Sequence, residues 1–252
     1  MMHIQFLGTG TSTGVPQIGC RCEVCTSRNE KDRRLRSSVL FTVGNKNILI
    51  DCGPDFRQQM LRSEVERIDA ILLTHAHYDH TGGIDDLRPY TARSPLPIYL
   101  EPDVARDIRL RLPYCFWEKR YPGIPNLTLT EIGESPFTAA GISVIPIRAM
   151  HFELPVLGFR IGQAAYITDM LTLPESEYEK LNDLDVLVIN ALRQTPHISH
   201  QTLESALRVI DRTAPRRAYL THISHQMGLH DAVSAQLPDG VSLAYDGLVL
   251  DV

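Results

Sequence analysis

Apolar residues along the chain fall into short runs that predict β-strands more often than helices. Apolar or alternating runs of four to eight residues, bounded by turn residues, are typical of strands. Such runs occur at residues 3–8, 38–43, 47–51, 70–75, 142–151, 157–161, 164–169, 185–191, 217–222 and 248–252. The turn at residues 44–47, rich in Gly and Asn, predicts a hairpin between the second and third runs.

Two segments have the pattern of helices. Residues 55–63 follow Pro54 and predict a short helix. Residues 200–212 predict an amphipathic helix that His200 opens, with Leu203, Leu207 and Ile210 on one face. Strands with helices interspersed in both halves, without a repeat or linker, predict an α+β fold in which helices cover two sheets. We expect a single domain over residues 1–252.

Composition narrows the class of protein. The chain has 43% hydrophobic and 22% charged residues, which suits a globular core. Its net charge of −5 disfavours a general polyanion binder, so we expect no strong nucleic-acid binding. No apolar run approaches the roughly 18–20 residues of a membrane span. Five cysteines, clustered toward one end and without a secretory signal pattern, favour a reducing, cytoplasmic setting over a disulfide framework.

The segment THAHYDH carries the strongest chemical signal. It places His75, His77, Asp79 and His80 directly after a predicted buried strand. Imidazoles and carboxylates are good ligands for zinc, manganese or iron. Three later apolar runs also end on residues of these types, which are His151, Asp169 and His222.

THAHYDH resembles the HxHxDH signature of the metallo-β-lactamase superfamily. LIDCG, at residues 49–53, is similar to an earlier motif of that superfamily. The resemblance implies an αββα sandwich, with two mixed β-sheets flanked by helices. It also implies a dinuclear site in which a first metal binds His75, His77 and His151. A second metal binds Asp79, His80 and His222, Asp169 bridges both metals, and Asp51 orients the ligand loop without binding metal.

Further motifs favour a phosphodiesterase branch of this superfamily. LGTGTSTG, at residues 7–14, is either a plain turn or a loop that contacts phosphate, and it resembles the opening of tRNase Z and PhnP-like phosphodiesterases. A PhnP-like pattern implies that His200 protonates the leaving oxygen, although a capping or surface role is the alternative. Asp246 resembles a residue that supports a histidine ligand by hydrogen bonding.

Three cysteines, Cys20, Cys22 and Cys25, lie within six residues. By the PhnP-like pattern they form a separate structural zinc site with His225, and Cys3His is an accepted closed zinc set. The alternative is buried or redox-active thiols with an exposed histidine. On the first interpretation, residues at about 16–36 form a zinc-clip loop that ties the N-terminal part of the chain to the segment bearing His222.

The predicted function is hydrolysis of a small phosphodiester, such as a cyclic ribose or nucleotide diester. Two divalent metals, manganese or zinc, would hold a bridging hydroxide. Asp79 and His200 are the predicted catalytic residues, and one structural zinc completes the cofactors. An RNA-processing nuclease of tRNase Z type and a non-catalytic zinc-binding interaction module stay open as alternatives. The resemblance also implies a homodimer.

Overall fold

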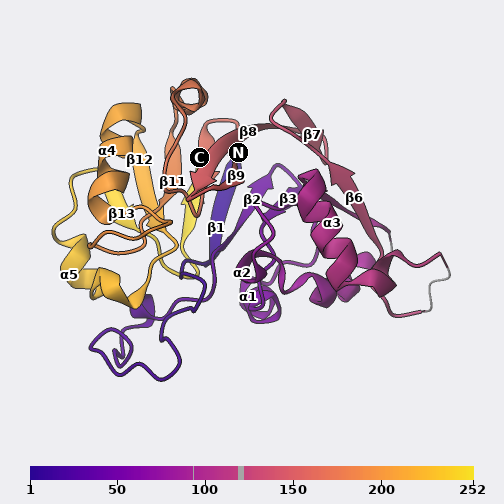
Figure 1. Cartoon of the computed structure of the whole chain (residues 1–252), viewed down its shortest axis with the longest axis horizontal. Coiled ribbons are helices and arrows are strands. Elements are labelled where there is room, and N and C mark those ends of the chain that lie inside the picture. Colours follow the sequence, from indigo (N-terminus) through magenta and orange to yellow (C-terminus); the bar gives the residue numbers. More distant parts are fainter. Residues whose placement is uncertain (93, 119–121) are drawn as a thin grey trace.

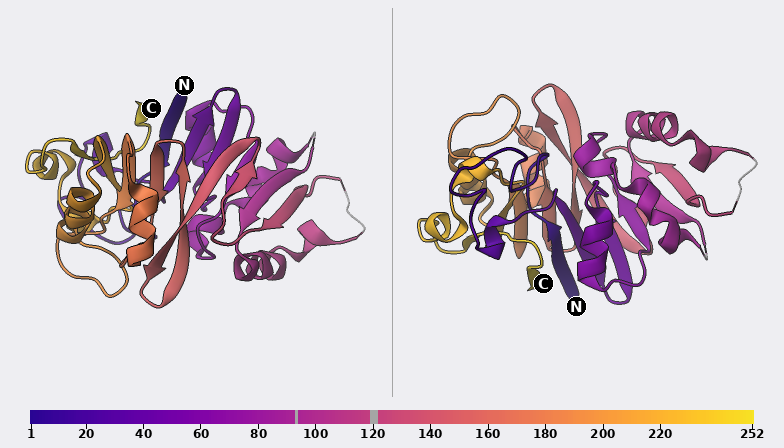
Figure 2. Two further views of the ribbon diagram at one scale, coloured as in Figure 1. Left: turned by 90° about the horizontal axis from the view of Figure 1, so that it is seen from above. Right: turned by 90° about the horizontal axis from the view of Figure 1, so that it is seen from below.

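The computed structural model describes residues 1–92, 94–118 and 122–252. Its strands form two seven-stranded sheets that face each other, with helices on the outside (Figure 1). The two termini lie close together at the edge of the sandwich, as the views from above and below show (Figure 2). Among the described residues, no helix has the length and apolar character needed to cross a membrane.

The first sheet comes from the N-terminal half plus the last strand. Its antiparallel part pairs β14 with β1, β1 with β2 and β2 with β3, and its parallel part continues through β4 and β5 to β6. In sheet order the strands are β14 (Val249–Asp251), β1 (Met2–Gly8), β2 (Ser38–Val43), β3 (Lys46–Ile50), β4 (Ala70–Leu72), β5 (Leu96–Leu100) and β6 (Leu127–Glu131).

The second sheet repeats this mixed arrangement. Strands β7 to β10 pair antiparallel in sequence order, and β10 to β13 pair parallel. The strands are β7 (Phe137–Ala139), β8 (Ile142–His151), β9 (Leu154–Ile161), β10 (Ala164–Ile167), β11 (Val186–Asn190), β12 (Arg217–Thr221) and β13 (Val241–Leu243).

Helices cover the outer face of each sheet. The α-helices are α1 (Phe56–Ser63), α2 (Tyr78–Thr81), α3 (Pro102–Arg111), α4 (Leu203–Thr213) and α5 (His230–Ser234). The short 3-10 helices are η1 (Glu30–Asp32), η2 (Ile84–Thr91), η3 (Pro113–Phe116), η4 (Glu175–Leu181) and η5 (His225–Met227). The apolar side chains of α1 and α3 pack on the first sheet, and those of α4 and α5 pack on the second.

Alternation along the strands builds three apolar layers. In β11, Val186 and Val188 face the core between the sheets, whereas Leu187 and Ile189 face the layer under α4. Both faces of this strand are therefore buried, which explains its continuous apolar run. Phe6 and Phe159 belong to opposite sheets and share the central core. The αββα sandwich and its two mixed sheets are confirmed.

Most predicted strands lie where the sequence pattern places them, although several boundaries differ, and two of these differences concern the candidate site. The run at 70–75 is a strand only over Ala70–Leu72, so His75 lies in the loop beyond it. The helix expected over 200–212 begins at Leu203. Thr202 is its N-cap, because the Thr202 side chain accepts a hydrogen bond from the backbone of Ser205. His200 therefore precedes the helix and does not open it.

Candidate metal centre

Three strand ends turn polar side chains toward one place. Asp51 follows β3, Asp169 follows β10 by two residues, and His222 follows β12. All three have left-handed backbone conformations, with φ of 63°, 57° and 54°. Non-glycine residues rarely adopt this conformation, and such residues gather at functional sites. The left-handed turn after each strand therefore directs its side chain toward the candidate site, which a continued strand conformation would not do.

The segment 74–81 is held tightly against the loop after β3. The Cys52 N–H donates to the His80 carbonyl at 2.8 Å. A Cβ at Gly53 would lie 2.0 Å from the Asp79 carbonyl oxygen, so only glycine permits this approach. Asp51 accepts a 2.6 Å hydrogen bond from His80 Nδ1 and a 2.9 Å bond from the backbone of Thr74. Asp51 thus holds the segment by hydrogen bonds, and its role in orienting metal ligands stays a prediction.

One tight group of donor atoms combines Asp79, His80, Asp169 and His222. His80 Nε2 lies 3.1 Å from Asp79 Oδ2 and 3.1 Å from Asp169 Oδ2. Asp169 Oδ2 also lies 3.2 Å from His222 Nδ1. The four ligand atoms lie within 4.8 Å of one another, and all four residues are buried. This is the second predicted ligand set together with the predicted bridging carboxylate.

A second group shares Asp169 and adds His151 and His200. His151 Nδ1 donates to the Ser199 carbonyl at 2.8 Å, which leaves Nε2 for a metal. His200 Nδ1 lies 3.9 Å from Asp169 Oδ1. Of the predicted partners of His151, this group contains Asp169, whereas His75 and His77 lie outside it.

His75 and His77 lie at the edge of the second group. Their ring centroids are 4.5 Å apart, and the His77 ring lies 5.3 Å from that of His151. The rings are neighbours, but the tight donor group around His151, which includes the predicted Asp169, contains His200 and neither of these two histidines.

The chemistry of the donors fits metal ions. His75 Nε2, His80 Nε2 and His200 Nδ1 are buried and have no hydrogen-bond partner among the described residues, which is costly unless another group binds them. Burial holds the pKa of His75 well below its usual value, so this ring is a neutral donor. Burial opposes charge on His80 also, yet the carboxylates of Asp169 and Asp79 raise its pKa well above normal. The carboxylates therefore favour positive charge at this place, which a bound cation would supply.

His200 is a neutral imidazole in this setting. Burial lowers its pKa to about 3, with a further lowering by His222. Its ring is 4.5 Å from that of His151 and 4.9 Å from that of His222. The position suits either a metal ligand or a group that exchanges a proton with substrate.

Asp246 does not support a histidine ligand through any of its hydrogen bonds within the described chain. Its carboxylate accepts from Thr9 N at 2.9 Å, from Thr9 Oγ1 at 2.8 Å and from Leu35 N at 2.7 Å. Burial raises the pKa of Asp246 to about 6. Asp246 joins the loop after β1 to the end of the zinc-clip loop, because backbone N–H groups of both segments donate to its carboxylate.

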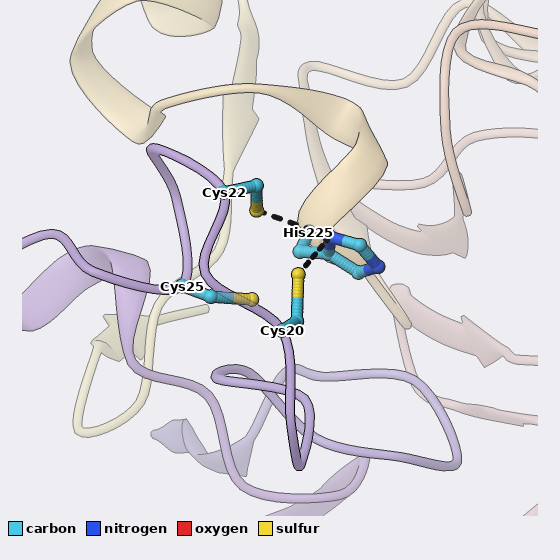
Figure 3. A group of neighbouring side chains, drawn as sticks. All are labelled: Cys20, Cys22, Cys25 and His225. Atoms are coloured by element: carbon cyan, nitrogen blue, oxygen red, sulfur yellow. Dashed lines mark hydrogen bonds between the residues drawn. The ribbon is translucent and has the colours of Figure 1, made fainter.

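The three cysteines of the zinc-clip loop converge with His225 (Figure 3). His225 Nδ1 lies 3.2 Å from Cys22 Sγ and 3.6 Å from Cys20 Sγ. A hydrogen bond from the Cys25 backbone lowers the pKa of Cys22 to about 6, which favours the thiolate that zinc binds. Burial raises the pKa of Cys25 to about 11. These four donors, within 4.8 Å of one another, form a second candidate metal site.

Two residues that contact the metal-ligand segments were not singled out by sequence. Thr11 Oγ1 lies 3.2 Å from His222 Nε2, and its only signal is its place in the LGTGTSTG loop. Arg111, at the end of α3, donates to the Ala76 carbonyl and to Thr81 Oγ1, both at 2.9 Å. Nothing in its local sequence indicates this contact, because it depends on how α3 packs on the sheet.

Comparison with known proteins identifies the class. The family described as "Beta-lactamase superfamily domain" matches residues 46–223. The chain therefore belongs to the metallo-β-lactamase superfamily. Within it, the chain belongs to the PhnP family, since it is 37% identical to a solved structure described as a new diphosphatase from that family. The TM-score is 0.94, with 100% of this chain and 98% of that chain covered.

Two other proteins are similar to this chain, one in sequence and one in fold alone. A protein of Porphyromonas gingivalis named octanoyltransferase is 45% identical over 98% of this chain, and the chain spans 51% of its length. Zinc-bound PqqB from Methylobacterium extorquens has a TM-score of 0.82 at 20% identity, covering 99% of this chain and all of that one, which shows the shared fold.

Proposed function

We propose that this protein is a two-metal phosphodiesterase that hydrolyses a small phosphodiester. The observation that carries the proposal is the pair of buried donor groups that share Asp169. Adjacent groups with one common carboxylate are the arrangement that two neighbouring metal ions require. The 37% identical relative described as a diphosphatase supports reaction at phosphorus.

The residues of the site would have three roles, which are to hold the metals, to orient a ligand and to donate a proton. Asp79, His80 and His222 would hold one ion, His75, His77 and His151 the other, and Asp169 both. When bound, two divalent ions acidify a water and stabilise negative charge on phosphate oxygens. Asp51 fixes the ring of His80 through its Nδ1 hydrogen bond, which sets the nitrogen that faces Asp79 and Asp169. His200 would supply the proton to the departing alkoxide once the negative charge of the bound phosphodiester raises its pKa and its ring is protonated.

The direct test is hydrolysis of bis(p-nitrophenyl) phosphate by purified protein loaded with manganese or zinc. We expect turnover that chelation abolishes and that readdition of metal restores. Thioesterase activity without phosphodiesterase activity under the same conditions would show that the reaction class is wrong. Cleavage of a tRNA precursor with no turnover of small diesters would favour the nuclease alternative.

A His200→Ala variant separates the two roles of this histidine. As a proton donor, His200 contributes most where the leaving oxygen is a basic alkoxide, so we expect kcat on a dialkyl phosphodiester to fall by about 10²–10⁴ while metal content stays at the wild-type level. Metal content is measured by elemental analysis of the purified variant. A lower metal content would instead assign His200 to the ligands, as its place beside His151 and Asp169 allows.

Octanoyl transfer is not the function that this site supports. The relative with that name is about twice as long as this chain, so about half of that protein has no counterpart here. The two donor groups around Asp169 consist of His and Asp side chains. Neither group contains a Cys, a side chain that forms acyl intermediates in covalent catalysis.

A further inference from the structure

The loop that carries His200 has no regular structure of its own. Residues 194–201 form neither helix nor strand, and residues 194–196 are exposed. The loop runs from β11 to α4, and a hydrogen bond from Leu192 N to the Gln201 carbonyl, at 3.0 Å, closes its base. The position of His200 therefore depends on the contacts that this loop makes with its neighbours.

Arg193, at the start of the loop, binds three oxygen atoms at once. Its Nε donates to the Thr195 carbonyl at 3.1 Å and its Nη2 to the Pro196 carbonyl at 2.6 Å, which fixes the first turn of the loop. Its Nη1 donates to Gln226 Oε1 at 2.6 Å. A guanidinium presents its donors in a rigid planar fork, so one side chain orients all three acceptors. The ammonium of a lysine has no such fixed geometry.

The partner of Arg193 belongs to the segment that bears a candidate zinc ligand. Gln226 lies in η5, whose first residue is His225 of the cysteine cluster. Gln194 Nε2 also donates to the Met227 carbonyl at 2.8 Å, so the loop makes a second contact with η5. The first turn of the loop is therefore attached to the segment that the zinc clip holds.

The far end of the same loop contacts the metal centre. The Ser199 carbonyl accepts a hydrogen bond from His151 Nδ1 at 2.8 Å. His200, the next residue, is buried, and its Nδ1 lies 3.9 Å from Asp169 Oδ1. The loop thus joins η5 to the metal centre, and a shift of its first turn would displace the ring of His200.

We propose that Arg193 is a positioning residue, which fixes the first turn of the loop against Gln226 and so keeps the His200 ring beside Asp169 for proton transfer to the leaving oxygen. This inference rests on the proposed phosphodiesterase and on His200 as its proton donor. A misplacement of about 1 Å can lower a rate by about 10²-fold, so a small movement of the loop is sufficient. The three hydrogen bonds of Arg193 reach no side chain of the metal centre, so we expect its removal to affect proton transfer and not metal content.

The test compares two diesters that differ in their need for a proton donor. In 2′,3′-cyclic AMP the leaving group is a basic ribose alkoxide, whereas bis(p-nitrophenyl) phosphate releases a weakly basic phenolate that departs without protonation. For metal-loaded Arg193→Ala we expect kcat on the cyclic ester to fall by about 10–100-fold, with at most a small loss on the p-nitrophenyl ester and wild-type metal content. Arg193→Lys should recover part of the loss, because an ammonium can still bind one of the acceptors. Arg208→Ala is the matched control, since Arg208 is an exposed arginine of α4 that pairs with Glu204.

A double variant shows whether the effect passes through His200. If it does, Arg193→Ala should cause no further loss on the cyclic ester once His200→Ala is present. Equal losses on both esters would assign Arg193 to general stability of the site and overturn the inference. Multiplied losses in the double variant, or wild-type rates in Arg193→Ala, would overturn it as well.

Hydrogen exchange separates this inference from the phosphodiesterase proposal. No turnover of either ester by the wild type would show that the phosphodiesterase proposal is wrong. In that case, or if only one ester is hydrolysed, exchange of the backbone amides of residues 194–201 decides the role of Arg193. Exchange about tenfold faster in Arg193→Ala, and unchanged in Arg208→Ala, supports the role in holding the loop. Exchange at the wild-type rate in Arg193→Ala refutes it.

Discussion

At the scale of single residues, burial decides what the ionisable groups can do. Asp51 is fully buried between Thr74 and the ring of His80, and its carboxylate receives hydrogen bonds from both. This fixes His80 with Nε2 toward Asp79 and Asp169. Asp51 therefore sets the orientation of a ring that belongs to the candidate metal centre.

Substitution of Asp51 tests this dependence. Asp51→Asn replaces one carboxylate oxygen by an N–H donor that cannot accept from His80 Nδ1, so we expect metal affinity to fall by about 10–100-fold. Affinity is measured by competition with a chelator. Asp69→Asn is the matched control, because the Asp69 carboxylate also accepts from a backbone N–H, that of Asn47, without contacting a metal-site residue. Equal losses in both variants would contradict the assigned role.

At the scale of elements, the zinc-clip loop is held to α5 by a buried polar network. The His230 N–H donates to Asp32 Oδ1 at 2.7 Å, and Arg34 Nη2 donates to His230 Nδ1 at 3.1 Å. Arg34 also donates to Thr9 Oγ1 at 2.8 Å. These contacts join three segments that are distant in sequence, and in Figure 1 the N-terminal loop lies beside α5.

This network predicts a loss of stability in acid. Burial, with the charge of Arg34 and Lys31 opposed by Asp231 and Asp32, lowers the pKa of His230 to about 4. The unfolded chain binds a proton near pH 6.5, so the contribution of neutral His230 is complete above pH 6.5 and is lost as pH falls toward 4. We expect this to be on the order of 2 kcal/mol between pH 7 and pH 4.5.

Urea unfolding of metal-free protein at both pH values measures this contribution. His230→Asn keeps an acceptor for Arg34 but does not titrate in this range, so its unfolding free energy should change less with pH than that of wild type. Protonation of Asp246 has the opposite effect on stability, because its raised pKa favours the folded state as pH falls. Asp246 is present in both wild type and variant, so its effect cancels when the two pH profiles are compared. Parallel pH profiles of the two proteins would show that the pKa of His230 is the same in the folded and unfolded states.

At the scale of the whole molecule, the metal centre lies where the two sheets meet. His75, Asp79 and His80 follow a strand of the first sheet, whereas Asp169 and His222 follow strands of the second. A hydrogen bond from Leu157 N to Thr74 O, at 3.0 Å, joins the sheets beside the metal-ligand segment. The common core of the sandwich therefore also sets the distance between the two halves of the site.

The cysteine cluster adds a second link across the molecule, which Cys22→Ser tests. We expect loss of about one zinc per chain, retention of the metals around Asp169, and a melting temperature lower by several °C, since 1 kcal/mol corresponds to about 2–4 °C in a chain of this size. Glu23→Gln, an exposed change in the same loop, is the control. Unchanged zinc content in Cys22→Ser would refute a metal site at these cysteines.

The sequence by itself determined the fold class and most of the candidate site. THAHYDH and the polar residues ending later strands are local signals, since a short apolar run and the residue after it are read without knowing what lies nearby. Asp51 and the cluster of Cys20, Cys22 and Cys25 could be predicted for the same reason. These signals, with the resemblance, were sufficient for the αββα sandwich and for a candidate metal centre.

Only the tertiary structure decided which donors lie together and what supports them. It grouped His151 with Asp169 and His200, moved Asp246 from the histidines to Thr9 and Leu35, and brought Arg111 to the metal-ligand segment. Such contacts join residues up to 237 positions apart. They depend on strand twist, turn conformation and the packing of two sheets, which act over the whole chain and leave no pattern in any short stretch of sequence.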